Sequence, residues 1–276
     1  MKPTIARLRN PLLRTDRSIS PSPRGLEGTR AAFFASYGES DRFSRSVIEL
    51  TRALSGRGYD VVLIRAASGG ARAQWPANEE AIRPTIMWRP NVGYDFGSWA
   101  VGIDQFPKLA GREHVLLVND SLVGPFGDID RMIDHFEHST ADVWAATCSE
   151  QVELHLQSFT LGFRRGVLRA YPLNRFWGSI REIGDKNLLI REYEIGLSRL
   201  IDREMLTAES FIPVGLVGRG QINPAYDSWD VLLRNGFPFV KRELLREDQP
   251  AALRERIVAE VRERWEQDPM QWFEPA

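Results

Sequence analysis

The stretch Val115-Leu116-Leu117-Val118-Asn119-Asp120-Ser121 decides the fold class of this chain. Four apolar residues that end abruptly in polar ones are typical of a buried strand that reaches the edge of a sheet. A second apolar run, 85–89, ends in the same way and is followed by the polar loop 91–97. The residues between the two runs suffice for a short helix over 97–109 and a return strand. The pattern therefore predicts a βαβ unit.

Strands and helices alternate through the first 150 residues. We predict strands at 31–37, 60–66, 85–89, 114–118 and 142–147, and helices at 47–54, 97–109 and 128–138. This order indicates one α/β domain over 29–249, a Rossmann-type sandwich with a mostly parallel central sheet and helices on both faces. The alternation then loosens, with a strand expected at 156–163, a long amphipathic helix at 187–205, and a charged helix at 250–268 within a C-terminal segment 250–276.

Parallel strands place the loops that follow them on one edge of the sheet. Ligands of open α/β sheets bind at that carboxyl edge. We therefore expect Asp95 and Asp120, which follow two different strands, to face one cleft.

The composition limits the function classes. The 276 residues carry a net charge of −1, with 43% hydrophobic and 26% charged residues. These values describe an ordinary globular protein without a field suited to nucleic acid. The single Cys148 excludes an intramolecular disulfide. No apolar stretch approaches the roughly 18 to 20 residues that span a membrane, so we expect a cytoplasmic protein.

Basic residues dominate the start of the chain. The first 25 residues contain Lys2, Arg7, Arg9, Arg14, Arg17 and Arg24 against Asp16 alone. No apolar core of roughly 7 to 15 residues marks a signal peptide there. We expect residues 1–28 to form a disordered basic tail, either solvated or held peripherally at the anionic inner face of the membrane.

Several separated motifs resemble the rhamnan synthesis F family of bacterial polysaccharide glycosyltransferases. They comprise Asn91, Gly93, Tyr94, Asp95, Phe96, Gly97 and Trp99; Asn119, Asp120, Ser121, Gly124 and Pro125; His155, Gln157 and Ser158; and Tyr193, Glu194, Gly196, Leu197 and Ser198. The likeness continues through 223–241 and spans 30–245, without the basic tail and the last helix. It implies a GT-A-like nucleotide-sugar fold and a role in rhamnose-rich surface polysaccharides.

The resemblance implies a donor site and an acceptor site. Donor-binding residues are expected at Asn91, Gly93, Asp95, Asn119, Ser121 and Lys241. Asp120 is the candidate for the diphosphate and for a Mg²⁺ or Mn²⁺ ion. Glu194 is the candidate general base, by analogy with inverting GT-A enzymes. Acceptor contacts are expected from His155, Gln157 and Trp177, with Trp99 as a second aromatic platform.

One departure from the broader GT-A pattern concerns the metal. That pattern has two Asp residues separated by one position, whereas this chain has Asn119, Asp120 and Ser121. Mg²⁺ binds through one or two carboxylates together with substrate phosphates and water, so the single carboxylate leaves metal dependence open.

Each candidate also has a structural interpretation. Asp120 and Asp95 suit a turn and a helix cap, Glu194 a solvated helix face, Lys241 a strand end, His155 a satisfied structural histidine, and the tryptophans the core. The single Cys and four dispersed His residues give no closed zinc site, and no dinucleotide or Walker motif occurs.

Two functions from different classes follow. The first is a glycosyltransferase that moves a sugar, expected to be rhamnose, from a nucleotide-diphosphate donor to a cell-surface polysaccharide or its lipid-linked precursor. The second is a catalytically inactive glycan-binding or assembly-scaffold domain of the same fold. A phosphohydrolase using Asp95 and Asp120 has less support, because the usual catalytic Asp motifs are absent.

Overall fold

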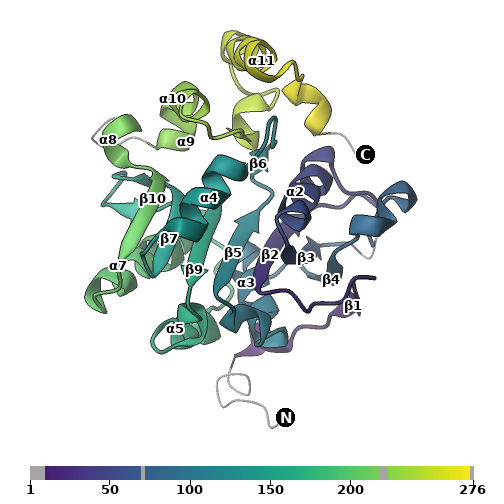
Figure 1. Ribbon diagram of the computed structural model, residues 1–276, viewed down its shortest axis with the longest axis vertical. Helices are drawn as coiled ribbons and strands as arrows, with labels where there is room; N and C mark the ends of the chain where they lie inside the picture. Colours follow the sequence, from purple (N-terminus) through teal and green to yellow (C-terminus); the bar gives the residue numbers. More distant parts are fainter. Residues whose placement is uncertain (1–9, 70–71, 218–222, 274–276) are drawn as a thin grey trace.

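A mixed β-sheet runs through the centre of the molecule (Figure 1). The computed structural model describes residues 10–69, 72–217 and 223–273. Within these residues a nine-stranded sheet has the order β1-β4-β3-β2-β5-β9-β7-β10, and β8 pairs with β7. The strands are β1 (Ser18–Ser20), β2 (Arg30–Tyr37), β3 (Tyr59–Ala67), β4 (Thr85–Pro90), β5 (His114–Asn119), β7 (Val143–Ser149), β8 (His155–Leu156), β9 (Thr160–Arg164) and β10 (Ala208–Ile212).

The four strands that carry the candidate site are parallel. β4, β3, β2 and β5 lie side by side, with Phe33 of β2 opposite Val62 of β3 and Leu117 of β5. β9 is antiparallel between β5 and β7, and β10 is parallel to β7. The predicted mostly parallel α/β sheet is therefore confirmed.

Helices cover both faces of the sheet, as predicted. α2 (Arg45–Gly56) and α4 (Asp130–His138) pack on the face that carries Phe34 and Leu116. α3 (Tyr94–Gln105), α5 (Leu173–Ser179) and α7 (Gly196–Arg203) pack on the opposite face, with Phe33 and Leu117. Because successive strand residues point to opposite faces, strands buried on both sides appear in the sequence as unbroken apolar runs.

The remaining elements are short helices, the two short strands β6 and β11, and the C-terminal helix α11. They are η1 (Pro11–Arg14), η2 (Ala77–Ile82), η3 (Leu109–Gly111), β6 (Leu122–Val123), η4 (Val167–Arg169), α6 (Lys186–Leu189), the π-helix η5 (Ile190–Ile195), α8 (Val214–Val217), α9 (Pro224–Asp227), α10 (Trp229–Arg234), β11 (Val240–Lys241), η6 (Arg242–Leu245), α11 (Ala251–Trp265) and η7 (Pro269–Trp272).

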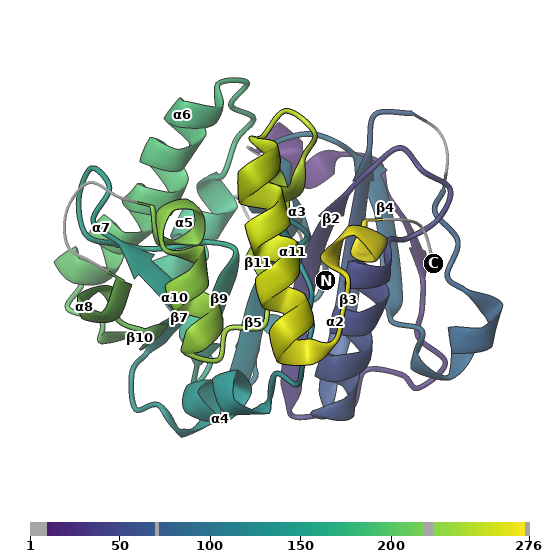
Figure 2. The same ribbon diagram turned by 90° about the horizontal axis from the view of Figure 1, so that it is seen from above.

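The predicted C-terminal helix is α11, which lies across the small sheet formed by β6 and β11 (Figure 2). Its Ile257 and Val261 are fully buried in one cluster with Val123 and Trp229. α11 therefore packs onto the same body as the strands. Residues 274–276 lie outside the described part of the chain.

The predicted disordered tail is wrong for residues 10–28. Leu12 and Leu13 in η1 are buried, and the Asn10 side-chain amide donates to Ile180 O at 2.6 Å. β1 pairs antiparallel with β4, which would otherwise be an open edge. Two leucines and an edge-covering strand are enough to order this segment, although the charges around them suggested a tail. Residues 1–9 lie outside the described residues.

β4, α3 and β5 form the predicted βαβ unit, with β3 and β2 lying between its two strands. Two further expectations need correction. The strand expected at 156–163 is two strands, β8 and β9, separated by residues 157–159. The helix expected at 187–205 is present as α6, η5 and α7, with a π-helical segment in its middle.

Candidate functional site

The loops after β4 and β5 meet at the carboxyl edge of the sheet. Three strand spacings of about 4.8 Å separate β4 from β5, and α3 spans this gap because it packs against β3 and β2. Asp95 lies in the first turn of α3. Asn119 Nδ2 donates to Asp95 Oδ2 at 2.7 Å. The structure thus joins the two loops that the sequence singled out.

A chain of hydrogen bonds continues from Asn119 to Lys241. Asn119 Oδ1 accepts from the Ser121 backbone N–H at 3.1 Å and from Ser121 Oγ at 2.6 Å. Lys241 Nζ donates to Ser121 Oγ at 3.1 Å and lies 5.1 Å from the centre of the Phe159 ring. Lys241 is placed here because β11 pairs with β6, just after Ser121. It is half-buried at the site and not a surface strand end.

Asp120 turns toward the end of β2. Its Oδ2 accepts from Ser36 Oγ at 2.8 Å and from the Tyr37 backbone N–H at 2.9 Å. Arg65 Nη1 donates to Ser36 Oγ at 2.9 Å, and Arg242 Nε donates to the Asp120 carbonyl at 3.0 Å. Among the described residues nothing donates to Asp120 Oδ1. One carboxylate oxygen thus ties β5 to β2, and the other has no hydrogen-bond partner in the described part of the chain.

The two acids are costly to ionise. Burial, followed by the negative charge of Asp120, raises the pKa of Asp95 to about 7, against Lys241 and the Asn119 hydrogen bond. Burial also raises the pKa of Asp120 above its ordinary value, although Arg242 opposes this. Burial lowers the pKa of Lys241, while Glu194 and Asp95 oppose the shift. An added cation would therefore stabilise the ionised forms of both acids.

Glu194, the expected general base, lies in the π-helix η5, an unusual element that recurs at functional sites. Its Oε2 accepts from the Ser158 backbone N–H at 2.9 Å and from Ser158 Oγ, and its Oε1 lies 3.4 Å from His155 Nε2. Burial alone would raise the pKa of Glu194, but the hydrogen bonds from His155 and Ser158 bring it below its ordinary value. Ser158 precedes Phe159, whose ring faces Lys241 and whose carbonyl accepts from the Asn119 N–H at 3.2 Å, so Glu194 lies beside the same site.

His155 and Gln157, the expected acceptor contacts, are both buried. His155 Nδ1 lies 2.8 Å from Glu153 O, and its other nitrogen faces Glu194. Gln157 Nε2 donates to Asn223 Oδ1 at 2.8 Å, and Gln157 Oε1 accepts from Thr147 Oγ1 at 2.6 Å. Both side chains are occupied by protein partners, so direct contact with a sugar would need these bonds to open.

Trp177 and Trp99 are core residues, so neither ring is exposed as a platform on which a sugar could stack. Their exposed fractions are 1% and 0%. Trp177 stacks on Phe96 with 5.7 Å between ring centres, and Trp99 Nε1 donates to Phe33 O and Val118 O at 3.2 Å. An aromatic cluster beneath α3 holds the turn that carries Asp95.

Asn91 and Gly93 occupy the loop ahead of α3. Asn91 is half-buried, and its backbone N–H donates to Ala67 O at 3.1 Å. Gly93 has φ +77°, and a Cβ there would lie 2.7 Å from Leu12 Cδ1. The close approach that needs this glycine is therefore to the N-terminal segment. Its backbone remains next to Asp95.

Sequence reasoning missed four residues at this edge: Ser36, Tyr37, Arg65 and Arg242. Tyr37 ends β2 and is 49% exposed, although it follows a buried strand. The available signal in the sequence was an aromatic residue at the end of the first apolar run, just before Gly38. Arg242 directly follows Lys241 in sequence and could have been included with it.

A metal would have limited protein ligands here. Within residues 10–69, 72–217 and 223–273 no group of three or more His, Cys, Asp or Glu side chains could hold an ion. Mg²⁺ accepts one or two carboxylates plus substrate phosphates. Asp120 Oδ1, which has no hydrogen-bond donor in the described part of the chain, fits one such ligand.

Two cavities lie away from this site, with volumes of about 140 and 260 Å³. Neither is lined by Asp95, Asp120 or Lys241. Of the expected site residues, Trp177 lines the larger one. Within the described part of the chain, no helix combines the length and apolar character that a membrane crossing requires.

The fold and site define an α/β protein whose acidic and basic side chains meet at the carboxyl edge of parallel strands, where such proteins bind ligands. Residues 77–269 match the family model of rhamnan synthesis protein F, and the chain belongs to this family. The predicted family is confirmed. The matched region includes α11, which the expected span of 30–245 left out.

The chain is similar to two curated relatives. It is 31% identical over 193 residues to the virulence protein VirA of Vibrio anguillarum, covering 58% of this chain and 62% of VirA. It is 30% identical over 119 residues to the uncharacterized protein y4gN of Sinorhizobium fredii, covering 41% of this chain and 31% of y4gN. The chain thus spans less than two thirds of either relative.

Two solved structures are also similar. A Desulfovibrio desulfuricans protein described as a nucleotide-diphospho-sugar transferase has a TM-score of 0.42 at 14% identity, covering 86% of this chain and 98% of its own. The galactosyltransferase LgtC, in complex with donor and acceptor sugar analogues, has a TM-score of 0.33 at 12% identity, covering 60% and 71%. These similarities are weak, and no site assignment rests on them.

Proposed function

We propose that this protein is a glycosyltransferase that moves a sugar, rhamnose, from a nucleotide-diphosphate donor to a cell-surface polysaccharide or its lipid-linked precursor. Membership of the rhamnan synthesis protein F family supports a role in polysaccharide synthesis. The observation that carries the proposal is the cluster of Asp120, Lys241 and Arg242 at the carboxyl edge of the sheet.

The cluster suits a departing diphosphate. Negative charge develops on this group as the glycosidic bond breaks, and fixed cations stabilise it. Lys241 and Arg242 supply two such cations, held through Ser121 and the Asp120 carbonyl. Asp120 Oδ1 would hold a Mg²⁺ or Mn²⁺ ion, which supplies further charge neutralisation to the phosphates when bound.

The nucleoside can be accommodated beside the same carboxylate. Tyr37 is half exposed, and its backbone N–H is fixed by Asp120. Its ring offers an apolar face for a base. Asp95 Oδ1 has no donor among the described residues and can accept from ribose or sugar hydroxyl groups.

Inverting transfer also needs a group that takes the proton of the acceptor hydroxyl. Such a group is most effective when its pKa lies near the working pH. The pKa of Asp95 is raised to about 7, whereas the pKa of Glu194 is lowered by its donors. Glu194→Gln tests the sequence-based assignment: loss of turnover with donor binding intact would support a base role, and retained turnover would exclude Glu194 from that role.

Calorimetry with UDP, dTDP and GDP tests the donor site directly. Each nucleotide is titrated into the full chain with and without Mg²⁺ or Mn²⁺. We expect one diphosphate to bind with a Kd of about 1 mM or tighter, and metal to tighten the binding. Absence of binding by all three would contradict the proposal.

A second candidate function is an inactive glycan-binding or scaffold domain. It is favoured by one observation: each of Asp120, Glu194 and His155 already has protein partners in the absence of ligand. Glycan binding without nucleotide binding in the same titrations would select it.

A further inference from the structure

A cavity of about 260 Å³ lies between α3 and α5, next to η1. It is separate from the candidate transfer site, because none of Asp95, Asp120 and Lys241 lines it. Pockets for drug-sized ligands start at about 300 Å³. This cavity therefore suits something smaller, such as one sugar ring.

The floor of the cavity is mainly apolar. Leu13, Ile103 and Trp177 line it and are at most 3% exposed. Trp177 adds a polar feature, because its Nε1–H is buried and has no acceptor in the described part of the chain. An unpaired buried N–H costs free energy. A ligand oxygen that reached it would recover that cost.

The rim of the cavity is polar and positively charged. Arg169 of η4 and Arg175 of α5 line it, and neither side chain forms an ion pair or hydrogen bond with a described residue. Asn174 contributes an amide, and Tyr171 contributes a ring that is 73% exposed. Among the described residues of the lining there is one carboxylate, Asp104, against the two guanidinium groups.

We propose that this cavity binds an acidic saccharide unit, a pyranose that carries a carboxylate or phosphate group. A guanidinium binds such a group with two parallel hydrogen bonds, which an ammonium cannot do. The Tyr171 ring offers a face for the C–H groups of the sugar, and the Asn174 amide suits its hydroxyls. The apolar floor excludes water beneath the ring. Polymeric acidic glycan would be held by this site at a distance from the transfer chemistry.

Titration of the full chain with D-glucuronic acid tests the proposal, with D-glucose as the neutral counterpart and inorganic phosphate as the simple anion. We expect glucuronic acid to bind at least about tenfold more tightly than either. In the double variant Arg169→Gln/Arg175→Gln this preference disappears. The exposed Arg246→Gln, which does not line the cavity, is the matched control and keeps it.

Tyr171→Ala separates the sugar contact from the charge contact. We expect this variant to bind glucuronic acid more weakly and phosphate as tightly as the parent does. Glucuronic acid binding that survives in the double variant would overturn the site, and phosphate that binds as tightly as glucuronic acid would overturn its saccharide character. Nucleotide diphosphate binding is expected to be the same in all these variants, so failure here is distinguishable from failure of the donor site.

Discussion

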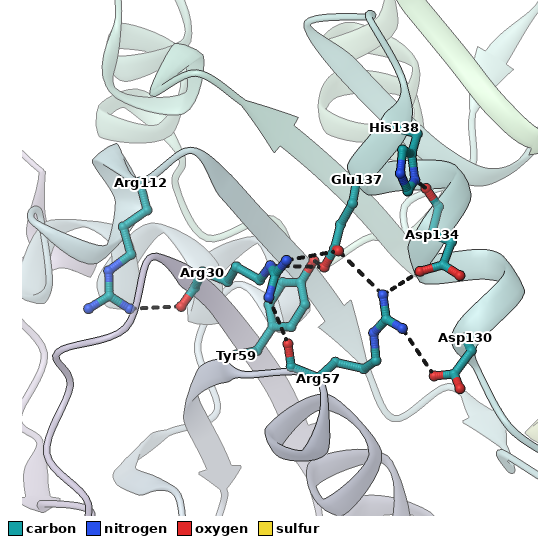
Figure 3. A network of polar contacts seen from close by, with 8 residues as sticks. All are labelled: Arg30, Arg57, Tyr59, Arg112, Asp130, Asp134, Glu137 and His138. Atoms are coloured by element: carbon teal, nitrogen blue, oxygen red, sulfur yellow. Dashed lines mark hydrogen bonds and ion pairs between the residues drawn. The ribbon is translucent and has the colours of Figure 1, made fainter.

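Buried carboxylates at the two ends of the parallel strands differ in how many hydrogen-bond and ion-pair partners they have. At the amino ends, Glu137 of α4 is surrounded by donors (Figure 3). Arg30 Nε lies 3.0 Å from Glu137 Oε1, Tyr59 OH donates to the same oxygen at 3.0 Å, and Arg57 Nη2 lies 3.3 Å from Oε2. At the carboxyl ends, Asp95 accepts one hydrogen bond from the described residues and lies near a second acid, Asp120.

The comparison distinguishes a carboxylate that stabilises the fold from carboxylates that can bind a ligand. Glu137 has both oxygens paired, so its network fastens α4 to the ends of β2 and β3 and leaves nothing for a ligand. Asp95 and Asp120 each retain an oxygen without a donor in the described residues, next to Lys241 and Arg242. Incompletely paired buried charge lowers stability and is typical of sites that await a ligand.

After the loss of Asp120 itself, the largest expected effect is the loss of activity on removing the cation at the carboxyl edge. Lys241→Met should lower transfer by about 100-fold or more, because the leaving diphosphate loses a fixed positive charge. Turnover of a donor sugar at saturating acceptor measures it. Lys186→Met, at a lysine whose side chain is 71% exposed, is the matched control and should keep its activity. Equal losses in both variants would contradict a specific role.

At the amino edge the expected effect is on stability. Glu137→Gln leaves Arg30 and Arg57 without their shared carboxylate, at a cost of about 2 kcal/mol in the free energy of unfolding, since both arginines are partly solvated. Urea denaturation measures this cost, and turnover per folded molecule should not change. Asp134→Asn, at a carboxylate 50% exposed, should cost about 0.5 kcal/mol. A Glu137 variant that loses turnover while fully folded would erase the distinction between the two edges.

The loop that presents Asp95 depends on Gly93. Gly93→Ala should destabilise the protein by about 1 to 2 kcal/mol, because its φ of +77° strains an alanine and the new Cβ meets Leu12 Cδ1 at 2.7 Å. Thermal unfolding compares it with Gly56→Ala, where nothing lies within 4 Å of the new Cβ. Gly56→Ala should be neutral or stabilising. Equal destabilisation would mean that packing against η1 does not hold the loop.

The smallest expected effect is a change in how stability depends on pH. The folded-state pKa of Asp95 is about 7, above the ordinary value of 3.8, so its ionisation opposes folding as the pH rises between these values. Asp95→Asn should therefore gain stability relative to the parent between pH 3.8 and about 7 and keep a constant difference above. After discounting for its partial exposure, the gain is on the order of 1 kcal/mol. If the difference in unfolding free energy between parent and variant does not vary with pH, the pKa of Asp95 is not raised in the folded state.

Much of this fold can be predicted from the sequence, and the reasons for the failures are specific. Unbroken apolar runs such as 115–118 identify strands buried on both faces, and the polar residues after them identify the site edge. Strand order is not local, so β3 and β2 between β4 and β5 could not be foreseen. Burial of Trp177 depends on which face α5 turns inward.

The site residues divide in the same way. Asp95, Asn119 and Ser121 come from two neighbouring motifs and meet as predicted. Tyr37 and Arg242 reach the site through strand pairings that no sequence period reports. Leu12 lies among basic residues, and this context did not predict that it packs against Gly93.

Turnover by Asp120→Asn tests the central claim most directly, namely that the carboxyl edge of the sheet transfers a sugar from a nucleotide diphosphate. Asparagine keeps an oxygen that accepts from Ser36 and the Tyr37 N–H, so the fold and its melting temperature should stay close to the parent. We predict that release of nucleoside diphosphate from the donor becomes undetectable in this variant. Release at the parental rate would contradict the claim.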